Sequence, residues 1–197
     1  MNTKEAILTR RSNRKYKAEA IDESIIEELV EAGRCAPSGG NSQSNHFFVI
    51  TEKEALDALA EKVQNAFKDM EITEGMYRSL ASSITQSKQG NYHFFYHAPC
   101  LIVIANQKDY GNHMADVACA LENIFLMANE LNLSSCYINQ LKWLNEEENI
   151  LEWFRAHGLK DEERIYGAVA IGYPDTEDGM PMRTRLRHDG NPVTYIR

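Results

Sequence analysis

Residues 99–105, PCLIVIA, form an almost unbroken apolar run with several β-branched side chains. An apolar run of this length predicts a strand that is buried on both of its faces. Three further segments are also expected to be strands: HFFVIT at 46–51, SSCYIN at 134–139 and IYGAVAIGYP at 165–174. A sheet built from such strands needs a layer of helices to cover it.

Amphipathic patterns that are typical of helices alternate with these strands. The first helix is expected to be capped by Asn2 or Thr3, the second begins after Asp22 and is stopped by Pro37, and the last is closed by Gly158. The expected helices cover residues 3–10, 23–36, 56–70, 113–131 and 146–157. Helices that alternate with buried strands predict an α/β sandwich.

The length of 197 residues is enough for one domain with a buried core, so we expect a single domain over residues 1–197. Residues 71–92 are polar and uneven, and they are expected to form a lid or a helical excursion. The formal charge of -8 argues against a nucleic-acid partner, because phosphate backbones require an extended positive face. No run of about 18 apolar residues is present, so no membrane span is expected.

The cysteines and the first residues of the chain indicate the compartment. MNTKEAILTRRSNRK lacks the apolar core of a secretory signal. Cys35, Cys100, Cys119 and Cys136 are widely spaced and include no C-x-x-C pair. Both observations favour reduced thiols and a cytoplasmic location.

Common catalytic signatures are missing from the sequence. It contains no phosphate-binding G-x-x-x-x-G-K-[ST], no G-x-G-x-x-G and no G-x-S-x-G. His93 and His97 are four residues apart, which suits a metal only on a helix, but they stand just before a proline and a strand. We therefore expect surface or packed histidines there and no metal site.

Three polar segments remain as candidates for a binding site: RRSNRK at 10–15, APSGGNSQ at 36–43 and RTRLR at 183–187. Each one alone is equally typical of a solvated face or an ordinary loop. Together they indicate an anion site, because arginine binds phosphate through forked, charge-assisted hydrogen bonds. Two arginine clusters from opposite ends of the chain could then close on the same group.

The middle segment offers a different kind of contact. Ser38, Asn41 and Gln43 carry side chains that can hydrogen-bond a ligand. Gly39 and Gly40 would let the backbone approach that ligand closely.

The C-terminal segment VTYIR, residues 193–197, is β-like but has no helix after it. Such a strand can pair with an edge of its own sheet or with an edge of a partner's sheet. The second alternative would make a dimer.

The sequence resembles the nitroreductase family of flavin enzymes over nearly its whole length. Four stretches carry the resemblance in the family's order: RRSNRKY (10–16), APSGGNSQSNHFFVI (36–50), LNLSSCYINQL (131–141) and GAVAIGYP (167–174) with a following arginine. The resemblance implies an α+β three-layer sandwich with a mixed central sheet and helices on both faces. It also implies a homodimer that exchanges C-terminal strands, with flavin mononucleotide (FMN) at the interface between the subunits.

The resemblance assigns cofactor contacts to particular positions of this sequence. On the phosphate and pyrimidine side these are Arg10, Arg11, Ser12 and Arg14, and along the ring and ribityl chain they are Pro37, Ser38 and Asn41. Near N5 the contacts come from the backbone of Ile138, Asn139 and Gln140, and at the ring from Asn91. The second phosphate ligand is expected to be Arg185, with Arg187 as the second choice.

Two departures from the family pattern stand close to the expected site. Gln43, Ser44 and Asn45 occupy positions where the family often has Gln-Pro-Trp. Asn139 and Gln140 stand where it often has glycine, and a side chain there would narrow the space over the ring.

The implied activity is ping-pong hydride transfer from NADH or NADPH through FMN to a nitroaromatic, a quinone or a similar small acceptor. No catalytic side chain is required, because the cofactor carries out the difficult step. Two alternatives stay open: a family relative with a dehalogenase-like or flavin-fragmenting reaction, and a flavin-binding module with little turnover.

Overall fold

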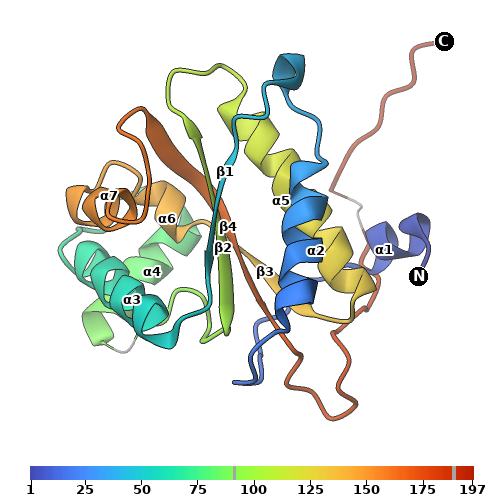
Figure 1. Ribbon diagram of the computed structural model, residues 1–197, viewed down its shortest axis with the longest axis horizontal. Coiled ribbons are helices and arrows are strands. Elements are labelled where there is room, and N and C mark those ends of the chain that lie inside the picture. The colour runs from blue at the N-terminus through green and yellow to red at the C-terminus, as the bar shows by residue number, and fades with distance from the viewer. Residues whose placement is uncertain (91, 188–189) are drawn as a thin grey trace.

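The computed structural model describes residues 1–90, 92–187 and 190–197. Its helices are α1 (Thr3–Thr9), α2 (Glu23–Arg34), α3 (Lys53–Lys68), α4 (Arg78–Gln89), α5 (His113–Glu130), α6 (Gln140–Trp143) and α7 (Glu148–Arg155), with a short 3-10 turn η1 at Gly39–Asn41. Its strands are β1 (His46–Ile50), β2 (Cys100–Gln107), β3 (Ser134–Ile138) and β4 (Glu163–Gly172). Figure 1 shows three layers, with α3, α4, α6 and α7 on one face of the sheet and α2 and α5 on the other.

The sheet confirms the α+β class but differs from the mixed sheet that the resemblance implied. Its strand order is β1-β2-β4-β3, and every pairing among the described strands is antiparallel. β2 and β3 do run in the same direction, joined through α5. β4 inserts between them and pairs with both, so no parallel neighbours result.

The sheet is buried on both faces, as the apolar runs predicted. Leu101 and Val103 of β2 belong to a core cluster shared with α3, α6 and α7. Ile102 and Ile104 belong to a second cluster shared with α2 and α5. Successive side chains of a strand point to opposite faces, so one apolar strand serves both layers.

Local signals explain several helix boundaries. The side chain of Asn2 accepts a hydrogen bond from the backbone N–H of Glu5 at 2.9 Å, which confirms it as the cap of α1. Gly158, with φ of +106°, follows the end of α7. The polar stretch 71–92 contains α4, whereas the short helix α6 had no counterpart among the expected elements.

The C-terminal tail differs from the expected strand. Residues 193–197 have no regular secondary structure and do not pair with the chain's own sheet. Tyr195 is 76% exposed and Ile196 is 96% exposed. Figure 1 shows this end of the chain extending away from the body. Among the described residues, the tail pairs with neither of the two edge strands, β1 and β3.

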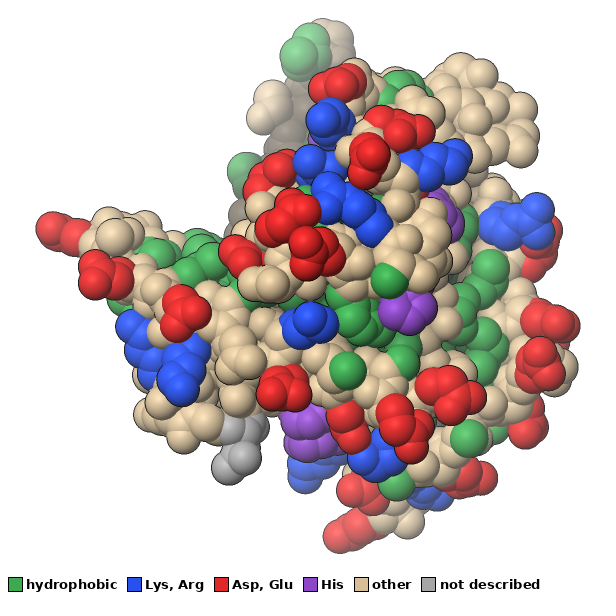
Figure 2. Space-filling view, turned by 60° about the vertical axis from the view of Figure 1, so that its left-hand side comes forward, with side chains coloured by type: hydrophobic (Ala, Val, Ile, Leu, Met, Phe, Trp, Pro, Cys, Tyr) green, Lys and Arg blue, Asp and Glu red, His purple; other side chains and the backbone are tan. Residues whose placement is uncertain are grey.

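The surface carries charges of both signs. On the face drawn in Figure 2, Asp and Glu side chains are interspersed with Lys and Arg, so the described residues on this face form no continuous positive surface. Over the described residues, every helix is too short or too polar to cross a membrane.

Candidate cofactor site

The basic segment at residues 10–17 is fixed across the end of the sheet by backbone hydrogen bonds. The N–H of Asn13 donates to the carbonyl of Ser135 at 2.9 Å, and that of Lys17 donates to the carbonyl of Tyr173 at 2.9 Å. These bonds connect the segment to the ends of β3 and β4, so its side chains are presented from a rigid support.

The side chain of Tyr16 connects the same segment to β4. Its hydroxyl donates to the carbonyl of Asn13 at 2.7 Å and lies 3.3 Å from that of Ala170. Burial raises the pKa of Tyr16, which keeps the phenol protonated and able to donate. Tyr16 is therefore a packing and positioning residue here.

Two arginines of the segment lie over aromatic rings. The guanidinium carbon of Arg10 is 5.5 Å from the ring centre of Phe125, and its Nε is 3.5 Å from the carboxylate of Glu122. The guanidinium carbon of Arg14 is 5.6 Å from the ring centre of Tyr96. Such cation–π contacts help to hold the two guanidinium groups in place.

Arg11 has a different environment. Its Nη1 atom is buried and has no hydrogen-bond partner among the described residues. A buried cationic nitrogen without an acceptor costs free energy, so the position fits the oxygen of an anionic ligand.

The second basic cluster lies beside the first. Hydrogen bonds join Asn13 to Met182, immediately before RTRLR. Arg183 donates from Nε to Oδ1 of Asn129 at 2.9 Å and from Nη2 to the carbonyl of Asn129. It thereby supplies positive charge to the end of α5, whose last turn holds no basic residue. Arg185 and Arg187 remain exposed.

A buried thiol lies beneath the basic segment. Burial raises the pKa of Cys136, and the neighbouring Arg14 and the Ser12 hydroxyl oppose the rise. Its Sγ donates to the carbonyl of Tyr137 at 3.5 Å. Cys136 is therefore a neutral thiol in the floor of the site.

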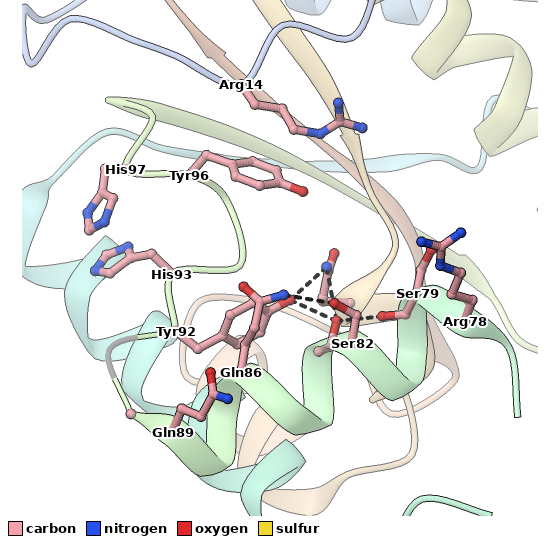
Figure 3. Close-up of a pocket in the computed structure, with 13 residues that line it drawn as sticks. Arg14, Arg78, Ser79, Ser82, Gln86, Gln89, Tyr92, His93, Tyr96 and His97 are labelled. Carbon is pink, nitrogen blue, oxygen red and sulfur yellow. Dashed lines mark hydrogen bonds between the residues drawn. The ribbon is translucent and has the colours of Figure 1, made fainter.

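A cavity of about 720 Å³ opens next to Arg14. Figure 3 shows Arg14 and Tyr96 on one side of it, with Ser82 and Gln86 of α4 on the opposite side. Its size is within the range typical of sites for cofactors and other small molecules.

One wall of the cavity is a closed hydrogen-bond network. The hydroxyl groups of Ser83 and Tyr92 are 2.8 Å apart, and the side-chain nitrogen of Gln140 donates to Tyr92 at 2.9 Å. The amide of Gln140 is thus held against the wall. It does not extend freely across the cavity. This placement limits the narrowing of the cavity that was expected from a side chain at this position.

The small-residue loop at 36–45 is fixed at the start of α5. The N–H of Gly39 donates to the buried carboxylate of Asp116 at 3.1 Å, and the hydroxyl of Tyr110 donates to the Gly39 carbonyl at 2.9 Å. Ser38 accepts a hydrogen bond from the N–H of Gln43 at 3.1 Å. A Cβ added at Gly39 would overlap the side chain of Tyr110, so this glycine serves packing inside the loop rather than approach to a ligand.

This loop and the basic segment lie at opposite ends of the sheet (Figure 1). At the end of the loop, Oδ1 of Asn45 accepts a hydrogen bond from Nδ2 of Asn106 at 2.8 Å. Asn106 of β2 pairs with Arg164 at the start of β4. Tyr16 is bridged to Pro174, beyond the other end of β4. β4 has ten residues, so the two features are about 30 Å apart at the usual rise of a strand.

The structure therefore brings only some of the expected site residues together. One group meets at the cavity end of the sheet: Arg10, Arg11, Ser12, Arg14, Ile138, Asn139 and Gln140. Pro37, Ser38 and Asn41 belong to the distant loop, and Arg185 and Arg187 lie on the adjacent tail. Asn91 lies outside the described residues.

Several site residues had not been expected from the sequence. Asp116 and Tyr110 shape the loop, and Tyr92 and Ser83 form the cavity wall. Asp116 did carry a signal, because an acid within the apolar pattern of residues 113–131 is buried only when it has a hydrogen-bonding role.

Comparison with known proteins gives the class. A protein-family model described as "Nitroreductase family" matches residues 7–173 of this chain. A protein of Archaeoglobus fulgidus, provisionally named an NADH dehydrogenase/NAD(P)H nitroreductase, is 29% identical over 175 residues, 87% of this chain and 84% of its own length.

Solved structures agree with this class. A nitroreductase with bound FMN from Bacteroides fragilis matches with a TM-score of 0.84 and 28% identity, covering 99% of this chain and 100% of that one. A nitroreductase with bound FMN from Desulfitobacterium hafniense has the same fold, with a TM-score of 0.81 and 22% identity, and covers 100% of both chains. The chain belongs to the nitroreductase family.

Proposed function

We propose that this protein is an FMN-dependent oxidoreductase that transfers a hydride from NADH or NADPH to a small acceptor such as a nitroaromatic or a quinone. The observation that carries this proposal is the buried Nη1 of Arg11, which has no hydrogen-bond partner among the described residues and belongs to the same basic segment as Arg14, which lines a cavity of about 720 Å³. The FMN bound in the solved structure from Bacteroides fragilis supports the identity of the cofactor.

The residues at this end of the sheet fit FMN chemically. Arg10, Arg11 and Ser12 offer cationic and hydroxyl donors for a phosphate, with Arg185 on the adjacent tail as the second phosphate ligand and Arg187 as the alternative. Arg14 lines the cavity, whereas Lys15 is not among its lining residues. We therefore assign Arg14 to the flavin ring.

The second wall of the site would come from another copy of the chain. Pro37, Ser38 and Asn41 lie about 30 Å from the basic segment along β4, so one chain cannot close both walls on one cofactor. A homodimer resolves this, because the loop of each copy can face the basic segment of the other.

Two exposed apolar features support such a dimer. The apolar helix α5 leaves Ala118 and Cys119 exposed. The tail leaves Val193, Tyr195 and Ile196 exposed, and burial of each such side chain contributes about 1.5–3 kcal/mol. Exchange of the tails would cover these side chains.

The chemistry assigns limited roles to the protein. Bound FMN would supply a two-electron carrier, so that NAD(P)H, a quinone and one proton give NAD(P)⁺ and a hydroquinone. The guanidinium of Arg14 would stabilise the negative charge on the pyrimidine side of the reduced ring. The backbone of Asn139, at the start of α6, would orient the ring from the side of N5. Gln140 is held in the cavity wall, which favours turnover over a closed binding module.

The test is a titration of the purified protein with FMN, followed by reduction. We expect quenching of flavin fluorescence at one FMN per chain, and then bleaching of the bound flavin by NADH or NADPH in the absence of oxygen. The proposal would be falsified if excess FMN caused no quenching. A bound flavin that neither nucleotide bleaches would instead favour the binding module.

A further inference from the structure

The side of α4 that faces the cavity is polar. Ser79, Ser82, Ser83 and Gln86 recur at the three- and four-residue spacing that places side chains on one face of a helix, and all four line the cavity. Figure 3 shows Ser79, Ser82 and Gln86 on this side of the space. Ile84 is fully buried on a different face of the helix. α4 thus packs through apolar contacts elsewhere and offers hydroxyl and amide groups to a ligand.

The charges around the cavity all have the same sign. Arg14 and Arg78 line it, and no Asp or Glu is among the described lining residues. Arg78 begins α4, whose first turn contains no acidic residue. In a partly enclosed space, two cations without a carboxylate among these lining residues favour a ligand that carries negative charge.

The hydroxyl group of Ser82 is arranged to donate a hydrogen bond to a ligand, whereas that of Ser83 is already hydrogen-bonded in the cavity wall. The amide nitrogen of Gln86 donates to Oγ of Ser82 at 2.9 Å, so the hydroxyl hydrogen of Ser82 is left for another acceptor. A neutral apolar ring would gain nothing from this donor. An oxygen-bearing group would gain hydrogen bonds that are poorly replaced once water is excluded.

We infer that α4 is the specificity element for the oxidised substrate, and that Arg78 binds a carboxylate on it. The inference rests on the proposed function, because Arg14 is assigned to the flavin ring, which leaves Arg78 as the free arginine among the described lining residues. The acceptor class is accordingly an aromatic nitro or quinone compound that carries a carboxylate.

The test uses benzoate as the probe and benzamide as its neutral counterpart. Each is titrated calorimetrically into FMN-loaded protein. We expect benzoate to bind about tenfold or more tightly than benzamide, as for a charge-assisted contact with arginine. Arg78→Gln should abolish this preference, and Arg78→Lys should restore part of it. Lys88→Gln is the control: Lys88 is also on α4, but it is not among the residues that line the cavity. The preference of this variant for benzoate over benzamide should equal that of the unaltered protein.

Two results would overturn the inference: equal binding of benzoate and benzamide by the unaltered protein, or an equal loss of preference in the Arg78→Gln and Lys88→Gln variants. Failure of the proposed function has a different signature, namely an absence of flavin binding or of bleaching by NAD(P)H. The same titrations on flavin-free protein would then still decide whether Arg78 binds a carboxylate.

Discussion

Asn13 and Met182 exchange two hydrogen bonds across 169 residues of sequence. The backbone N–H of Met182 donates to Oδ1 of Asn13 at 2.9 Å, and Nδ2 of Asn13 donates to the carbonyl of Met182 at 3.4 Å. This contact joins the N-terminal arginines to the arginine-rich tail. One amide side chain thus links the two clusters directly, beside the hydrogen bonds that Arg183 makes to Asn129.

Replacing Asn13 by Ala should loosen this connection. The variant loses the two hydrogen bonds to Met182 and a third from Nδ2 of Asn13 to the carbonyl of Arg11 at 3.1 Å. Loss of the two bonds to Met182 alone is worth about 1–2 kcal/mol, so the dissociation constant of FMN should rise about tenfold or more. Fluorescence quenching measures this value directly. Asn149→Ala is the matched control, because Asn149 is exposed and its side chain makes a single hydrogen bond among the described residues, to Glu147 at 3.5 Å. Equal affinities for the two variants would contradict a role for the contact.

Arg11 should show opposite effects on stability and on binding. Its buried Nη1 lacks a partner among the described residues, so Arg11→Met should raise the free energy of unfolding of the flavin-free protein by about 1 kcal/mol. The same variant should bind FMN at least about tenfold more weakly, because a charge-assisted contact is lost. Urea unfolding and flavin titration measure the two quantities. A variant that is less stable and binds FMN normally would show that Arg11 is structural.

Most elements of the fold were predictable from the sequence, but the short helix α6 and the order of the strands were not. PCLIVIA and IYGAVAIGYP are apolar on both faces, which is a local property that a buried strand must have. The insertion of β4 between β2 and β3 depends on pairing over long distances in sequence, such as Cys136 with Ala170. The mixed sheet was therefore the wrong expectation.

The candidate site was predictable to a similar degree. Charged and small residues in RRSNRK, PSGGNSQ and RTRLR, taken together, predict an anion site. Their placement at opposite ends of the sheet follows from the path of the chain, which no local pattern reveals. The tail VTYIR has the composition of a strand, but a strand also needs an edge to pair with.

His93, which stacks on His97, should make stability depend on pH. Their rings stack at 3.7 Å, and burial followed by the charge of His97 lowers the pKa of His93, against the opposing influence of Asp57. The neutral form is therefore favoured in the folded state. Stability should fall as the pH falls below the ordinary histidine value of about 6.5, because the unfolded chain then binds the additional proton.

Urea unfolding at pH 8 and pH 5 tests this prediction. His93→Gln should lose less stability between the two values than the unaltered protein, because it removes the group whose pKa is lowered. His157→Gln, on an exposed side chain, serves as the control. An identical pH dependence for His93→Gln and the unaltered protein would exclude a contribution from His93.

Two adjacent glycines of the loop should differ in their tolerance of alanine. A Cβ at Gly39 would overlap Tyr110 and Asn112, whereas a Cβ at Gly40 would have no neighbour within 4 Å. Gly40→Ala should cost only the strain of its φ of +59°, about 1–2 kcal/mol. Gly39→Ala should also displace the loop and raise the dissociation constant of FMN about tenfold or more. Flavin titration of both variants distinguishes loop geometry from backbone strain.

Mixing two defective variants should restore flavin binding if each site uses two chains. The first variant, Arg10→Ala with Arg14→Ala, alters only the basic wall, and the second, Ser38→Ala with Asn41→Ala, alters only the loop. In a mixed dimer, the intact basic wall of the second variant faces the intact loop of the first, so one of the two sites is complete. After the two variants are unfolded together in urea and refolded, a random mixture contains about half mixed dimers, and FMN binding should return to about a quarter of the sites. If both walls belonged to one chain, every site in the mixture would keep a defect, and binding would stay at the level of the separate variants.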